Sequence, residues 1–105
     1  GKKKVRGSCD QIAKSSHCID FVGSVYTEER MKLSCSEGKF SKNTCPYSKN
    51  GGCRATVDTV AESIIWSYSY GGSPMSGDAL KYEKLACNSL EVSKWISAEE
   101  FDNIK

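Results

Sequence analysis

A short motif occurs twice in this chain, and this recurrence constrains the fold more than any other feature of the sequence. Lys32-Leu33-Ser34-Cys35 returns as Lys84-Leu85-Ala86-Cys87, and Phe40-Ser41-Lys42 is matched at the same offset by Val92-Ser93-Lys94. The chain is short enough for one domain. The recurrence therefore predicts one structural unit used twice within that domain.

The two predicted units differ in length. Cys9 of the first corresponds to Cys53 of the second, and the second has a longer interval before its helix. We place the extra residues in the glycine-rich segment 71–77, where a solvent-exposed loop can lengthen at small entropic cost. We expect two ββαβ-like repeats, residues 9–47 and 53–97.

Turn and capping signals assign the elements of each unit. In the first unit we expect strands at 9–13 and 18–22, a helix from Thr27 to Cys35, and a strand at 40–45. In the second we expect strands at 53–57 and 63–70, a helix capped by Ser76 or Asp78, and a strand at 90–96. Ser97 and Glu100 form a capping-box pattern for a short helix at 98–104. The predicted fold class is α+β: a small disulfide-rich domain with an antiparallel sheet and two main helices.

The chain has six cysteines among 105 residues. An even number at this density is typical of oxidising compartments, so we expect an extracytoplasmic protein that is secreted, periplasmic or on the cell surface. No apolar run is long enough to span a membrane, and no signal peptide is present. We therefore expect membrane attachment only through a lipid anchor upstream of Gly1.

The repeat narrows the choice of disulfide pairs. Equivalent positions in two similar units should form equivalent bridges, which predicts Cys9–Cys35 and Cys53–Cys87 and leaves Cys18–Cys45. A bridge between Cys45 and Cys53 across the Asn50-Gly51 turn remains an alternative.

Charge gives little indication of a partner. The formal net charge is +2, and the only dense basic cluster is Lys2-Lys3-Lys4 with Arg6. We interpret residues 1–8 as a flexible basic tail before a domain at 9–105. The alternative is an arm for anionic glycans, acidic lipid headgroups or nucleic acid. Nucleic-acid binders usually carry a wider basic surface, so no nucleic-acid partner is expected.

The sequence offers weak candidates for catalysis. His17 lies beside Cys18, but adjacent residues of a strand point to opposite faces, and a disulfide at Cys18 would remove the nucleophile. The cysteine intervals do not suit zinc. The acidic residues show no calcium-loop spacing; they include Asp10, Asp20, Asp58, Glu62 and Asp78. We expect no enzyme, and we assign no catalytic, cofactor-binding or metal-binding residue.

An aromatic ladder is the most prominent surface candidate. Alternation along residues 63–70 places Ile64, Trp66, Tyr68 and Tyr70 on one face of a strand. In the structural interpretation, the ladder packs beneath the second helix. In the functional interpretation, Trp66, Tyr68, Tyr70 and Met75 form an exposed edge that binds a protein or a glycan.

The run Cys9-Asp10, Cys18-Ile19-Asp20-Phe21, Cys35, Gly38-x-Phe40, Cys45-Pro46 and Gly52-Cys53 resembles small, uncharacterised, cysteine-rich envelope proteins and lipoproteins of bacteria. The resemblance implies a location in the cell envelope or outside the cell, and it carries no catalytic residue.

The sequence predicts an extracytoplasmic, non-enzymatic binding or surface module whose partner is unknown. The alternative is a small secreted effector, either a toxin or an enzyme inhibitor. An enzyme whose acidic site is assembled only by the fold is the third hypothesis.

Overall fold

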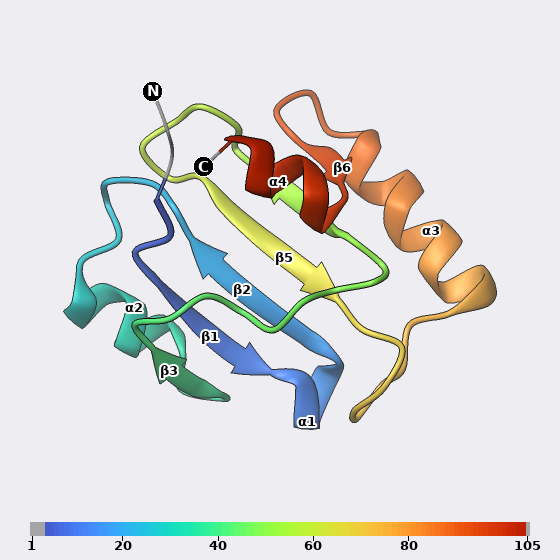
Figure 1. The fold of residues 1–105 in the computed structure, drawn as a ribbon, viewed down its shortest axis with the longest axis horizontal. Helices are drawn as coiled ribbons and strands as arrows, with labels where there is room; N and C mark the ends of the chain where they lie inside the picture. Colours follow the sequence, from blue (N-terminus) through green and yellow to red (C-terminus); the bar gives the residue numbers. More distant parts are fainter. Residues whose placement is uncertain (1–3, 105) are drawn as a thin grey trace.

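A six-stranded antiparallel sheet forms the centre of the molecule (Figure 1). The computed structural model describes residues 4–104. The strand order is β3-β1-β2-β5-β4-β6. In chain order the elements are β1 (Gly7–Gln11), α1 (Ile12–Ser15), β2 (His17–Phe21), α2 (Glu28–Ser34), β3 (Lys39–Ser41), β4 (Gly52–Ala55), β5 (Ser63–Ser67), α3 (Gly77–Asn88), β6 (Lys94–Ile96) and α4 (Ala98–Ile104). The α+β class and the antiparallel sheet agree with the sequence prediction.

The strands of the two predicted units occupy separate halves of the sheet. β1, β2 and β3 form one half, β4, β5 and β6 form the other, and β2 pairs with β5 where the halves meet. The internal repeat itself stays a prediction, because a strand order does not establish a duplication of the sequence.

Two disulfides attach helices to one face of the sheet. The pairing across β1, β2, β5 and β4 places Cys9 and Cys53 in one row, so their side chains point to the same face. Cys9 is bonded to Cys35 at the end of α2, and Cys53 is bonded to Cys87 in α3. Helices α2 and α3 therefore cover the same face.

The opposite face lies beneath α4 and the segment 42–51. Cys18 and Trp66 are register partners on this face. The Cys18–Cys45 bridge attaches the segment, and the ring of Phe101 in α4 meets Trp66 edge to face at 6.1 Å between centroids. Ile64, Trp66 and Tyr68 of the aromatic ladder therefore pack on the face covered by α4 and not beneath α3, which corrects the structural interpretation of the ladder.

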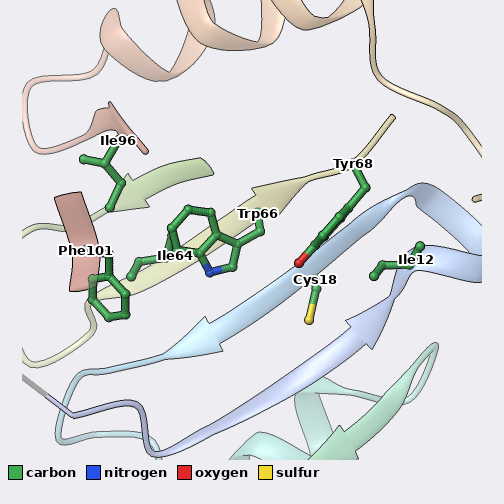
Figure 2. Packing of buried hydrophobic residues seen from close by; sticks show 7 residues of the cluster. All are labelled: Ile12, Cys18, Ile64, Trp66, Tyr68, Ile96 and Phe101. Atoms are coloured by element: carbon green, nitrogen blue, oxygen red, sulfur yellow. The ribbon is translucent and has the colours of Figure 1, made fainter. Parts of the chain in front are cut away.

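The sheet separates two hydrophobic clusters. The larger one lies on the α4 face, as Figure 2 shows, and contains Ile12, Cys18, Ile64, Trp66, Tyr68, Ile96 and Phe101. The smaller one lies beneath α2 and contains Cys9, Phe21, Met31 and Cys35. Both clusters contain disulfides, so covalent bonds cross the regions where apolar side chains are buried.

The three disulfides are the pairs that the repeat favoured, and no cysteine of the chain is free. Their Cα–Cα distances run from 5.5 to 5.9 Å, within the usual range for such bonds. The alternative Cys45–Cys53 bridge is wrong, because both cysteines are bonded elsewhere.

Several predicted boundaries move. The first strand begins at Gly7, and Arg6 N–H already donates to the carbonyl of Phe21, so the ordered chain starts before Cys9. Lys2 and Lys3 of the predicted basic tail lie outside the described residues. Helix α1 was not predicted. It begins where the Asp10 carboxylate accepts a hydrogen bond from Ile12 N–H. The strand predicted at 63–70 ends at Ser67.

Candidate functional site

The four predicted partner-binding residues are divided between the core and the surface. Trp66 and Tyr68 are 4% and 2% exposed, whereas Tyr70 is 54% exposed. Met75 is half-buried, and its N–H donates to the carbonyl of Tyr68. The core role of Trp66 and Tyr68 removes them from direct contact with a partner, and Tyr70 remains as the accessible aromatic residue.

Tyr70 stands beside a surface depression of about 910 Å³, which we call the large depression. Ile12 and Ala13 of α1 contribute apolar wall, and Pro46 contributes more from the segment that crosses the sheet. The Tyr70 ring meets the buried ring of Tyr68 at 5.5 Å between centroids. A volume of this size is within the range of small-molecule sites, and the mixture of an aromatic ring with aliphatic walls is typical of them.

Close backbone contacts hold the walls of the large depression together. Gly72 N–H donates to the carbonyl of Ile12, and Ser73 N–H donates to the hydroxyl of Ser16. A Cβ atom at Gly71 would lie 2.1 Å from the Ile12 oxygen, so only glycine allows this approach. The predicted solvent loop is therefore attached to α1.

The rim of the large depression carries charges that balance. Asp10 and Glu37 contribute two negative groups, while Lys14 and Lys39 contribute two positive groups. Lys14 and Glu37 form an exposed ion pair with each other. A site with balanced charges selects a ligand mainly by shape and hydrogen bonding.

Tyr68 supports this surface from below. Its hydroxyl donates to the carbonyl of Pro46 at 2.7 Å, which joins the chain just after β5 to segment 42–51. Burial raises the pKa of the Tyr68 phenol above its ordinary value, with a smaller contribution from the negative charge of Asp20. The phenol therefore stays neutral and keeps donating to Pro46 at physiological pH.

Two further depressions share lining residues with the large one or with each other. Tyr70 also lines a depression of about 360 Å³, the middle depression, which Tyr47 lines as well. Tyr47 in turn lines the small depression, of about 200 Å³, next to Trp66 and Phe101. Tyr47 is 65% exposed, so each of two accessible tyrosines is shared between the linings of two depressions.

The Cys–His hypothesis is wrong because Cys18 is bonded to Cys45. His17 instead joins β2 to α3. Its Nδ1 lies 2.6 Å from the carbonyl oxygen of Ser15, and its Nε2 lies 2.5 Å from Glu83 Oε2. Because a carbonyl oxygen only accepts, Nδ1 donates, and Nε2 faces the carboxylate. Both ring nitrogens are thus occupied by structural contacts.

The most buried acidic residues also have structural partners. Glu62 is fully buried and accepts from Arg54 Nε at 3.1 Å and from Asp58 N–H. Asp20 is 2% exposed and accepts from Cys45 N–H and from the indole N–H of Trp66. These bonds attach turns and the crossing segment to the sheet.

The described residues offer neither a metal-binding cluster nor a membrane-spanning helix. No group of three or more His, Cys, Asp or Glu side chains is placed to hold a metal ion among residues 4–104. In the same part of the chain, the helices are all too short or too polar to cross a membrane.

Comparisons with known proteins returned no relative. No protein-family profile matches the chain, and searches of curated proteins and of solved structures found no match. The geometry of the surface therefore carries the functional argument.

Sequence reasoning missed most of this surface. Tyr47 and Pro46 follow Cys45 directly, and the Cys18–Cys45 bridge brings them to the end of β5. Because this bridge was predicted, it could have indicated that Pro46 and Tyr47, the residues after Cys45, lie close to the strand that carries Trp66. Ile12 and Ala13 lie in the unpredicted helix α1, and no periodic pattern marks so short an element.

Proposed function

We propose that the chain is a non-enzymatic binding module of the extracytoplasmic space and that the surface around Tyr70 is its binding site. The observation that carries the proposal is the exposed Tyr70 ring beside a depression of about 910 Å³ with apolar walls. Large aromatic rings at the edge of a concave surface are common anchors in recognition sites.

The stapled scaffold supports this role. The Cys18–Cys45 bridge holds the segment that carries Pro46 and Tyr47, and the close contact of Gly71 with Ile12 holds the opposite wall. Walls that are fixed before binding lose little conformational entropy when a ligand enters. A small domain can thus offer a preformed site.

Three disulfides support the extracytoplasmic location, because such bonds persist where thiols are oxidised. The resemblance to cysteine-rich bacterial envelope proteins favours a secreted protein or one on the cell envelope. A lipid anchor upstream is the corresponding proposal for membrane attachment. Protein and glycan are the two partner classes that fit a surface of tyrosine rings and polar rim groups.

A binding screen tests the proposed function. The disulfide-intact protein is labelled and applied to arrays of glycans and of peptides, together with Tyr70→Ala and the control Tyr82→Ala. Tyr82 is 63% exposed on α3 and does not line any of the three depressions.

We expect wild type and Tyr82→Ala to bind the same array members and Tyr70→Ala to bind them at least about fivefold more weakly. The bound ligand should be recovered chemically unchanged. Equal binding by the Tyr70→Ala variant, turnover of the ligand, or no binding to either array would contradict the proposal.

A further inference from the structure

We propose that the Tyr70 surface binds an uncharged oligosaccharide, whose successive sugar units occupy the depressions on either side of Tyr70 and stack on Tyr70 and Tyr47. This inference rests on the proposed function and names the class of ligand. It starts from one geometric fact: Tyr70 lines both the large and the middle depression, and Tyr47 lines both the middle and the small one.

Both rings are positioned before a ligand arrives. The Tyr47 hydroxyl donates to Glu99 Oε2 at 2.8 Å, and this bond and the negative charge of Glu99 raise the pKa of the Tyr47 phenol. Tyr70 leans on the buried ring of Tyr68 with an interplanar angle of 63°. Two exposed rings, each of which lines two depressions, suit a ligand built from repeated units.

Sugar rings match these surfaces chemically. A pyranose has faces rich in C–H groups, which carry partial positive charge, and the face of an aromatic ring is the negative part of its quadrupole. The hydroxyl groups around a pyranose require donors and acceptors at the rim. The large depression supplies them in the amide of Gln11 and the carboxylate of Asp10.

Charge favours a neutral ligand. The four charges around the large depression cancel, and a single lysine, Lys49, lines the middle one. Asp20 and Asp102 line the small depression, so neither sign dominates along the three. Binding should therefore depend on stacking and hydrogen bonds and should be insensitive to salt.

Backbone bonding disfavours an extended peptide. Peptides that add to a sheet edge bind through main-chain groups of that edge. Here the carbonyl of Ile12 accepts from Ser16 and Gly72, the carbonyl of Tyr68 accepts from Met75, and the carbonyl of Pro46 accepts from Tyr68. These three carbonyls already have partners within the fold, which makes them poor acceptors for the main chain of a peptide.

The test is a titration of the disulfide-intact protein, followed by amide NMR and calorimetry, with named probes. These are neutral tetrasaccharides (cellotetraose, maltotetraose and chitotetraose), their monosaccharide units, tetragalacturonate as an acidic chain of equal length, and a neutral tetrapeptide. We expect at least one neutral tetrasaccharide to bind and to shift amides of residues 47–50 and 69–72. Its monosaccharide should bind about tenfold more weakly, because it reaches only one ring.

Variants separate stacking from folding. Tyr70→Ala and Tyr47→Ala should each weaken binding by about fivefold or more, whereas Tyr70→Phe, which keeps the ring, should stay within about twofold of wild type. Tyr82→Ala is the matched control for an exposed tyrosine outside the three depressions. Unchanged amide spectra away from the site show that each variant is folded.

Each other outcome overturns the inference in a distinct way. Binding of tetragalacturonate alone, lost in high salt, would show charge recognition. Tyr70-dependent binding of the peptide alone would leave the proposed function intact and contradict the oligosaccharide. Equal affinity for a tetrasaccharide and its monosaccharide would contradict an extended site, and no binding by any neutral tetrasaccharide at about 10 mM would contradict the ligand class.

Discussion

Gly71 illustrates how a single residue determines the shape of the candidate site. Its φ of +104° lies in the region that favours glycine, and its missing side chain lets the chain pass over the carbonyl of Ile12. Gly77 also has a positive φ, of +53°, but no atom lies within 4 Å of the Cβ that a substitution would add. A substitution at Gly77 would therefore meet backbone strain alone, whereas a substitution at Gly71 would meet both backbone strain and a steric clash.

We predict that Gly71→Ala is far more destabilising than Gly77→Ala. Gly77→Ala should lower the free energy of unfolding by about 1 kcal/mol through the strained φ alone. Gly71→Ala should cost at least about 2 kcal/mol more, because backbone atoms of Ile12 have to move. Urea unfolding of the two variants measures this difference, and equal losses would show that the 71–72 segment is not held against α1.

Tyr68 gives a prediction about alkaline pH. Because its pKa is higher in the folded than in the unfolded protein, the folded state keeps a proton that the unfolded chain loses above about pH 10. The free energy of unfolding should therefore fall as pH rises beyond that value. Tyr68→Phe removes the ionisable group and should flatten this fall.

The same variant has a cost at neutral pH. It deletes the hydrogen bond from Tyr68 to the carbonyl of Pro46, so we expect about 1 kcal/mol less stability at pH 7. Denaturant unfolding of wild type and Tyr68→Phe from pH 7 to pH 11 checks both effects. If the free energy of unfolding of wild type and of Tyr68→Phe changed with pH in parallel from pH 7 to pH 11, the burial of an ionisable phenol at position 68 would be contradicted.

Helices α3 and α4 differ in how their first turns are capped. In α4, Glu100 N–H donates to the Ser97 hydroxyl and Ser97 N–H donates to the Glu100 carboxylate, which is the predicted capping box. In α3, Ser76 occupies the N-cap position but makes no side-chain capping bond. The same residue type thus has a different energetic role in each helix.

We predict that Ser97→Ala destabilises α4 by about 1 kcal/mol, whereas Ser76→Ala has an effect of only a few tenths of a kcal/mol on α3. Phe101 of α4 packs on Trp66, so the loss of helix stability should also loosen the larger hydrophobic cluster. Hydrogen exchange of amides in the two helices measures the local effects. A larger effect at Ser76 than at Ser97 would contradict this assignment of the caps.

Across the whole molecule, the three disulfides join helix α2, segment 42–51 and helix α3 to the sheet. Their sequence separations are 26, 27 and 34 residues. Loops of this length correspond to about 3 to 4 kcal/mol of stabilisation each in the chain-entropy description. An ordinary domain has a net stability of only about 5 to 15 kcal/mol.

We predict that full reduction at neutral pH abolishes the cooperative thermal transition. Circular dichroism of the oxidised and the fully reduced, alkylated protein tests this. An unchanged transition after reduction would show that the two hydrophobic clusters stabilise the fold without their bridges.

Replacing only Cys53 and Cys87 by serine should loosen α3. The half of the sheet formed by β1, β2 and β3 should keep its native amide spectrum.

Much of the fold could be predicted because its signals are local. Caps such as Thr27, whose side-chain oxygen accepts from Arg30 N–H, depend on residues a few positions apart. Alternation correctly placed Ile64 and Trp66 on one face of β5, and Tyr68, directly after the strand, belongs to the same cluster. The early start of β1 was missed because it depends on pairing with β2. Helix α1 was missed because its first turn is fixed by the hydrogen bond from Ile12 N–H to the Asp10 carboxylate and not by hydrophobic periodicity.

The candidate site was predictable only in part. Tyr70 was recognised from its place at the end of an alternating strand, but alternation does not tell whether a face is covered. Trp66 and Tyr68 are buried because α4 and segment 42–51 fold over them. Tyr47 was not predicted, because its position beside Tyr70 is created by contacts between segments distant in the chain.

The sequence by itself indicated the α+β fold class and the caps at Thr27 and Ser97, because these follow from periodicity and local hydrogen bonding. It favoured the three observed cysteine pairs through a predicted repeat, and the structure decided against the Cys45–Cys53 alternative. The tertiary structure alone decided which face of each strand is covered and which tyrosines remain accessible. The physical reason is that burial depends on how distant segments pack together. The Cys18–Cys45 bridge and α4 bury Trp66 and leave Tyr47 and Tyr70 exposed in the lining of one depression.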